Sequence, residues 1–102
     1  MGQLSLIVQF EIAPGQEAEF EAAIRSHARS CIAEEPGCLR FEVNYPLDEK
    51  GNRIPNRMMA NELFADQQAL IDHRATERWE VLSERFKTLL VNRRPELSEL
   101  DE

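Results

Sequence analysis

The chain has 102 residues, of which 42% are hydrophobic and 30% are charged. This is the composition of an ordinary globular protein, so it excludes a disordered or fibrous chain, and the length predicts a single domain over residues 1–102. Nineteen acidic against twelve basic residues give a net charge of −7, which disfavours nucleic acid as a partner because basic side chains carry most of that affinity.

The apolar runs and the cysteines bear on the cellular location of the protein. No apolar run is longer than that of residues 6–8, which is far shorter than the roughly 20 residues that a membrane span requires. The two cysteines, Cys31 and Cys38, do not form a CxxC pair and are too few for a disulfide scaffold. We therefore expect a cytoplasmic protein with reduced thiols that binds neither nucleic acid nor a membrane.

The first part of the chain predicts a strand, a helix and a second strand. Apolar and polar residues alternate over residues 4–12, as in a half-buried strand. After Pro14 and Gly15, apolar residues recur at three- and four-residue spacing, which predicts an amphipathic helix ending near Glu35. Alternation returns over residues 39–45 and predicts a second strand, with four residues on its buried face: Leu39, Phe41, Val43 and Tyr45.

The middle of the chain predicts a loop, a strand and a short helix. Residues 48–56 are polar and contain glycine and proline, so a solvated loop should join the second and third strands. Residues 57–64 are short and mostly apolar, which fits the third strand. Asp66 is a suitable N-cap for a helix that runs to residue 73 or 74.

The last part predicts a longer helix and an edge strand. Thr76 can cap this helix, and Pro95 is expected to end it. Its buried stripe comprises Trp79, Leu82, Phe86, Leu89 and Leu90. Residues 96–101 alternate imperfectly and predict a fourth strand at the edge of the sheet.

This order of elements is the split βαβ arrangement of an α+β, ferredoxin-like domain. Such a domain has a four-stranded antiparallel sheet with its helices on one face. The other face is expected to carry Ile7, Met59 and Leu63 among polar and charged side chains. Because a domain of this size has a thin core, we expect a partner to cover this face through a partly hydrated contact.

Three ionisable residues fall on the face assigned to the helices: His27, Glu62 and His73. Each has a structural interpretation, namely a buried neutral imidazole, a carboxylate turned outward by a bulge, and a last-turn histidine that favours the helix dipole. If strict alternation holds, all three converge on one cavity and form an acid–base constellation. Trp79 is either core packing or the wall of a pocket for an aromatic ligand.

Other chemistries find less support in the sequence. His27 and Cys31 lie one helical turn apart and supply half of a metal site, but no third or fourth ligand follows at suitable spacing. The glycines form no phosphate-binding loop, and no GxSxG elbow carries a serine nucleophile. We therefore expect neither a metal nor another cofactor.

Residues 35–43 read EPGCLRFEV, and this segment resembles the antibiotic biosynthesis monooxygenase family, which includes cofactor-independent quinol monooxygenases. Residues 14–20 resemble the family's PG-x-E-x-EF helix start, residues 62–64 its strand glutamate, and residues 73–76 its H-x-x-T stretch. Two departures stand out. Residues 77–79 replace the Pro-His-Phe that commonly follows, and the third strand has Met58, Met59 and Asn61 where aromatics are usual.

The resemblance implies a homodimer whose sheets form a dimeric α/β barrel, with a small cavity between sheet and helices in each subunit. It also implies a cofactor-free monooxygenase that acts on dioxygen and a small electron-rich aromatic such as a hydroquinone or polyphenol. His73 would be the general base, with Glu62 and His27 orienting it or relaying the proton. The substrate would be bound by Trp79, Phe41 and Asn61.

Two alternatives remain. The family also contains an isomerase of phosphorylated signalling molecules, so the same base could move a proton on a small phosphorylated carbonyl compound. The altered third strand and the missing second histidine are also consistent with a non-catalytic dimeric binding module of the same fold.

Overall fold

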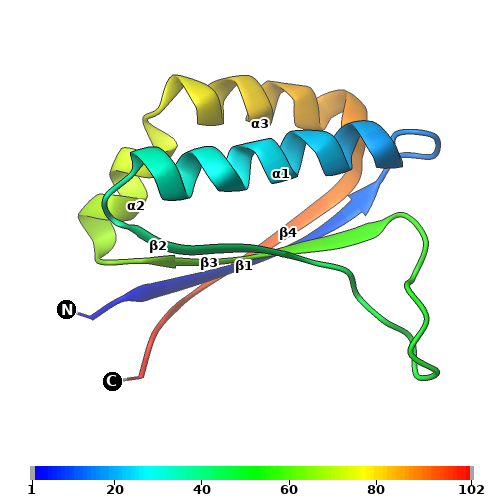
Figure 1. Ribbon diagram of the computed structural model, residues 1–102, viewed down its shortest axis with the longest axis horizontal. Coiled ribbons are helices and arrows are strands. Elements are labelled where there is room, and N and C mark those ends of the chain that lie inside the picture. Colours follow the sequence, from blue (N-terminus) through cyan, green and yellow to red (C-terminus); the bar gives the residue numbers. More distant parts are fainter. Residues whose placement is uncertain (1, 102) are drawn as a thin grey trace.

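Four strands form one antiparallel sheet, and three helices cover one of its faces (Figure 1). The computed structural model describes residues 2–101. The strands lie in the order β2-β3-β1-β4. In chain order the elements are β1 (Leu4–Ile12), α1 (Glu17–Glu34), β2 (Cys38–Asn44), β3 (Arg57–Phe64), α2 (Gln67–Arg74), α3 (Glu77–Leu89) and β4 (Leu90–Glu99). The predicted α+β ferredoxin-like fold class is confirmed.

The core lies between the helical layer and the sheet. Every second residue of β1 is buried, as the alternation predicts. Phe10 of β1, Phe20 of α1 and Phe86 of α3 contact one another, with ring centroids 4.9–6.0 Å apart. Each such side chain contributes about 1.5–3 kcal/mol through burial, so this cluster fixes α1 and α3 against β1. The site described below includes side chains from both of these helices.

Two predicted helix caps are present and set the ends of α2 and α3. The Asp66 carboxylate accepts a hydrogen bond from the backbone N–H of Ala69 at 2.8 Å. The Thr76 hydroxyl accepts one from the backbone N–H of Trp79 at 3.1 Å. Side-chain caps satisfy N–H groups that have no partner within the helix, which is why these residues start helices here.

The second strand departs from the expected alternation at Leu39. Cys38 pairs with Phe64 and Arg40 pairs with Leu63, so Leu39 is an extra residue in a β-bulge. The bulge buries the Cys38 side chain and leaves Leu39 47% exposed. The prediction that Leu39 lies on the buried face is therefore wrong, while Phe41 and Val43 do pack against the core.

The last helix ends earlier, and the last strand is longer, than the sequence predicts. α3 stops at Leu89, and β4 begins at Leu90 and continues through Pro95, which pairs with Val8. The predictions that Pro95 ends the helix and that Leu90 belongs to its stripe are therefore wrong. Proline is tolerated there because β4 is an edge strand and pairs only with β1.

Among the described residues, no helix is both long enough and apolar enough to cross a membrane.

The loop between β2 and β3 projects past the sheet in Figure 1. It is braced by Arg53, whose guanidinium lies 3.7 Å from the centroid of the Tyr45 ring.

The turn before β2 depends on Gly37. A Cβ at this position would lie 2.4 Å from the Cβ of Ala69 on α2. We predict that Gly37→Ala lowers the free energy of unfolding by about 1–3 kcal/mol, because α2 would have to move away from the turn. Urea denaturation of Gly37→Ala, Ala69→Gly and the double variant measures this. The double variant should lose less stability than the sum of the two single changes, whereas strict additivity would contradict the close contact.

Candidate active site

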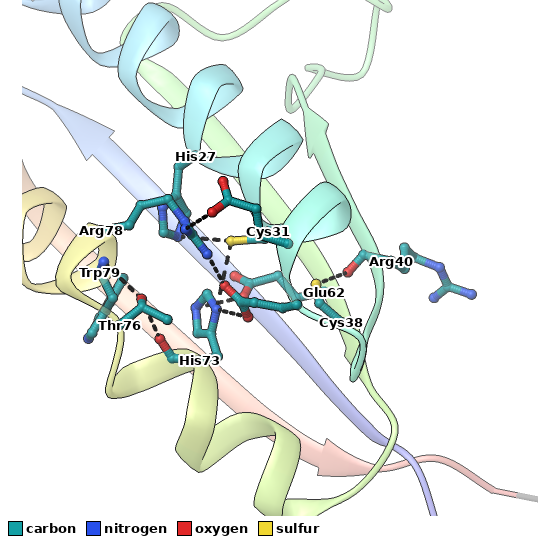
Figure 2. A network of polar contacts seen from close by, with 11 residues as sticks. His27, Cys31, Cys38, Arg40, Glu62, His73, Thr76, Arg78 and Trp79 are labelled. Atoms are coloured by element: carbon teal, nitrogen blue, oxygen red, sulfur yellow. Dashed lines mark hydrogen bonds and ion pairs between the residues drawn. The ribbon is translucent and has the colours of Figure 1, made fainter.

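The three ionisable side chains singled out from the sequence, His27, Glu62 and His73, meet between the sheet and the helices (Figure 2). They come from α1, β3 and α2 and are 4%, 4% and 3% exposed. The two imidazole rings meet edge to face, with centroids 5.5 Å apart. Buried ionisable groups that converge in this way are candidates for acid–base chemistry.

His73 lies between two carboxyl groups. Its Nδ1 is 2.9 Å from Glu35 Oε1, and its Nε2 is 4.0 Å from Glu62 Oε1, which is too far for a hydrogen bond. Because an ionised Glu35 can only accept, Nδ1 carries the proton and the lone pair lies on Nε2. The Thr76 hydroxyl donates to the His73 carbonyl oxygen at 2.9 Å and so fixes the end of α2. Nε2 of His73 is therefore the atom best placed to take a proton.

Glu35 is the C-cap residue of α1, and its carboxylate joins the ends of the three helices. Its second oxygen accepts from the Arg78 guanidinium of α3. Burial alone would raise the pKa of Glu35, but the hydrogen bond from His73 and the Arg78 guanidinium hold it below its ordinary value. Burial lowers the pKa of His73, against the opposing effect of Glu35. An ionised carboxylate thus orients a neutral imidazole, as in the catalytic triad of hydrolases.

Glu62 favours its protonated form. Burial raises the pKa of Glu62 to about 8, although the positive charges of Arg93 and Arg74 oppose the shift. The free-energy cost of removing the Glu62 carboxylate from water exceeds its favourable electrostatic interaction with these two arginines. Near neutral pH the Glu62 carboxyl therefore holds a proton that it can donate toward the cavity or toward His73.

His27 forms the back of the cluster with Cys31, one turn further along α1. Cys31 Sγ lies 3.5 Å from His27 Nε2 and 3.7 Å from His73 Nδ1. Burial lowers the pKa of His27 to about 4, and the electrostatic interactions of His27 with a second imidazolium at His73 and with the Arg78 guanidinium act in the same direction, so the two histidines do not both become charged. Burial and the Glu35 carboxylate raise the pKa of the Cys31 thiol, so this thiol stays protonated and is a poor nucleophile.

Two aromatic rings enclose the imidazoles. The Trp79 centroid lies 5.7 Å from that of His73, and the Phe41 centroid lies 5.4 Å from that of His27. The structure does not bring Asn61 to this cluster. Asn61 pairs with Ile7 and with Glu42 in the neighbouring strands, and alternation along β3 places it on the sheet face opposite Glu62.

The hollow beside Glu62 and His73 is small. It has a volume of about 20 Å³ and is lined by the Trp79 and Arg93 side chains together with apolar residues of β1. Such a space holds about one water, whereas a cavity that binds benzene has about 150 Å³. The Arg93 guanidinium lies 5.3 Å from the centroid of the Trp79 ring. Displacement of Arg93 or Trp79 is therefore required before an aromatic molecule can enter.

Sequence reasoning missed Glu35 and Arg78 as parts of this site, and it considered Cys31 only as half of a metal site with His27. Glu35 belongs to the EPG segment, where its position in a turn hides its contact with a histidine 38 residues further along. Arg78 was noted only as a departure from the family pattern, although it holds the second oxygen of Glu35. One signal in the sequence could have pointed to Glu35 and Arg78. Buried histidines on the face between helices and sheet need polar partners, and charged residues near the helix ends can supply them.

The fold and the cluster together define a small α+β protein with a cluster of buried ionisable side chains between helices and sheet. Residues 4–85 match the family model of the antibiotic biosynthesis monooxygenases. The match covers most of the chain, and the protein belongs to this family.

Solved structures agree in fold over the whole chain. A candidate antibiotic biosynthesis monooxygenase from Caulobacter crescentus has a TM-score of 0.86 at 24% identity, with 99% of this chain and 92% of the other covered. The protein PA3566 from Pseudomonas aeruginosa has a TM-score of 0.84 at 24% identity, with 100% and 97% covered. A further candidate monooxygenase, from Nitrosomonas europaea, has a TM-score of 0.83 at 18% identity, with 98% and 92% covered. No curated protein matches the sequence. At these identities the likeness shows the shared fold.

The raised pKa of Glu62 predicts a pH-dependent stability. The ordinary pKa of 4.5 applies in the unfolded chain and about 8 in the folded one, so the folded protein loses stability as pH rises through this window. Glu62→Gln has no carboxyl to titrate, so its free energy of unfolding should not fall in this way, and its advantage over the parent should grow by about 5 kcal/mol between the two pKa values.

Urea denaturation of both proteins at several pH values measures the difference. Glu42→Gln, which removes an exposed carboxylate from β2, controls for the loss of one negative charge. Parallel profiles for Glu62→Gln and the parent would contradict a buried, protonated Glu62.

Proposed function

We propose that this protein is a cofactor-free monooxygenase that oxidises a small electron-rich aromatic of the hydroquinone or polyphenol type. Membership of the family supports oxygenation as the reaction class. The observation that carries the proposal is a buried histidine held by a half-buried carboxylate beside a small hollow: His73 is bonded to Glu35, and its free nitrogen lies toward Glu62. An imidazole with a free nitrogen and a carboxylate that orients it can remove the proton of a phenol without a metal.

The first step is a proton transfer. Nε2 of His73 accepts the hydroxyl proton of the bound hydroquinone, and Glu35 stabilises the imidazolium through Nδ1. Removal of the proton gives an electron-rich phenolate that can reduce dioxygen itself. The low polarity around the rings of Phe41 and Trp79 strengthens each of these electrostatic contacts.

The overall reaction balances without an external reductant. One hydroquinone and one O2 give one hydroxyquinone and one water. The substrate loses two electrons in becoming a quinone and two more when a ring C–H becomes C–OH, and these four electrons reduce both oxygen atoms. Protonated Glu62 lies beside the hollow and is placed to supply a proton to the departing oxygen.

Access of the substrate depends on Arg93 and Trp79, which line the small hollow. Arg93 lies on an edge strand, and its Nε is buried without a hydrogen-bond partner among the described residues. Movement of this side chain therefore breaks no hydrogen bond at Nε. The substrate ring would then stack on Trp79, in the place that the guanidinium now takes.

A second candidate function follows from the charges at the hollow. Arg74 and Arg93 both line it beside Glu62, and two guanidinium groups favour a negatively charged ligand. This favours the isomerase alternative, in which His73 and Glu62 move a proton on a small phosphorylated carbonyl compound. Such a reaction consumes no oxygen.

We predict that metal-stripped protein consumes one O2 per hydroxyquinone formed and that one labelled atom from 18O2 appears in the product. His73→Gln should lower the rate about 100-fold or more, because the amide cannot accept the proton. Asp72→Asn, a neighbouring change on the exposed side of α2, should retain the parental rate. Oxygen uptake and mass spectrometry with a panel of hydroquinones measure these quantities.

Absence of turnover with every hydroquinone would contradict oxygenation. If hydrogen peroxide is released and the product carries no 18O, the protein is an oxidase and not a monooxygenase. Turnover of a phosphorylated carbonyl compound under nitrogen would support the isomerase, and a ligand bound without turnover would support the binding module. Full activity of His73→Gln would overturn only the assignment of the base.

We also propose that the protein is a homodimer formed through the sheet face opposite the helices. Met59, which lies on that face by its pairing with Gln9 and Asn44, is only half-buried. Ile7 on the same face is 37% exposed. A second copy would cover these apolar side chains and add burial that a thin core lacks.

Sedimentation equilibrium at micromolar concentration should give the mass of a dimer, with an interface above about 1,000 Å². Met59→Glu should shift the protein toward monomer, because a charge would be buried in the contact. Ile32→Glu, which places the same charge on the exposed side of α1, should leave the dimer intact. A monomeric parent, or equal effects of both variants, would contradict this interface.

A further inference from the structure

The cluster behind the catalytic histidine has the composition of a metal site. Three donor atoms, His27 Nε2, Cys31 Sγ and a nitrogen of His73, lie within 4.8 Å of one another, and all three residues are buried. Figure 2 shows Cys31 between the two imidazoles, with dashed contacts to both. Two nitrogens and one sulfur are donors that zinc prefers, and they come from two different helices.

We propose that His27, Cys31 and His73 bind a zinc ion, with the Glu35 carboxylate as the fourth ligand. A tetrahedral zinc with Zn–S near 2.3 Å and Zn–N near 2.0 Å has sulfur–nitrogen edges of about 3.5 Å. Cys31 Sγ already lies 3.5 Å from His27 Nε2 and 3.7 Å from His73 Nδ1. Two edges of the coordination tetrahedron are therefore in place before any side chain moves.

Glu35 completes the donor set. Its Oε1 lies 2.9 Å from His73 Nδ1, close to the oxygen–nitrogen edge of about 3.3 Å in such a site. The charges also balance, since one thiolate and one carboxylate neutralise a divalent ion. Zinc binds neutral imidazoles and a thiolate, so the Cys31 thiol must release its proton when the ion binds.

Residues around the proposed zinc site could orient its ligands, and a groove could admit the ion from solvent. If Nδ1 of His73 holds the ion, its proton moves to Nε2, which lies 4.0 Å from Glu62 Oε1. Once Glu62 moves closer and gives up its proton, it would act as the outer carboxylate that a ligating histidine usually has in zinc sites. On the other side, a groove of about 440 Å³ between α1 and α3 is lined by His27 and Arg78 and offers a path from solvent.

Zinc binding and base catalysis use opposite tautomers of His73. The base needs the proton on Nδ1 and the lone pair on Nε2, whereas the ion needs the lone pair on Nδ1. A bound ion therefore withdraws His73 from acid–base chemistry, and the two uses exclude each other. The binding itself does not depend on the proposed oxygenation, because its test involves no turnover.

The test is metal binding by chelator-treated protein. Calorimetry with Zn²⁺ should show one ion per chain, a dissociation constant in the micromolar range or below, and release of a proton from Cys31. Co²⁺ should give a thiolate-to-metal charge-transfer band together with the visible absorption of a tetrahedral ion. Mg²⁺ should not bind, because it requires oxygen ligands in octahedral geometry.

Variants separate this site from adventitious binding. Cys31→Ser should abolish the charge-transfer band and weaken Zn²⁺ binding by more than about tenfold. Cys38→Ser changes the other buried cysteine and should leave the band intact. Absence of the band in the parent protein, or its persistence in Cys31→Ser, would overturn the proposal. If Cys31→Ser does not fold, the presence or absence of the charge-transfer band in the parent and in Cys38→Ser still tests the proposal.

Discussion

The hydrogen bond between Glu35 and His73 is the interaction on which the rest of the site depends. It joins the end of α1 to the end of α2, and the ion pair of Glu35 with Arg78 extends the link to α3. Glu35 is half-buried, and a carboxylate removed from water is costly unless it is paired, so both partners help to keep Glu35 ionised. The bond selects the tautomer of His73 and thereby decides which nitrogen can accept a proton or hold a metal ion.

The position of this bond follows from packing that has no chemical role. The phenylalanine cluster fixes α1 and α3 against β1, and the close contact of Gly37 with Ala69 brings α2 against the turn that carries Glu35. Glu62 then projects from β3 into the same hollow and retains its proton near neutral pH. The hollow accommodates a small molecule only after Arg93 or Trp79 moves, so access and chemistry are controlled by different residues.

Periodicity was sufficient to predict the fold and the burial of His27, Glu62 and His73, because alternation and helical spacing report directly on which face a residue occupies. It failed at Leu39 and at Leu90, where a bulge and an edge strand override local pattern. Glu35 and Arg78 were missed because their role exists only where three helix ends meet. Asn61 was assigned to the pocket through the resemblance, although its alternation with Glu62 places it on the other face.

The central claim is that His73 is a buried, neutral imidazole oriented by Glu35. Nitrogen-15 NMR of the histidine rings in metal-free protein near neutral pH tests it most directly. The account predicts a His73 ring with its proton on Nδ1, slow to exchange with water, and loss of that tautomer preference in Glu35→Gln. A His73 ring that carries its proton on Nε2, or that exchanges as freely as a solvated imidazole, would contradict the account.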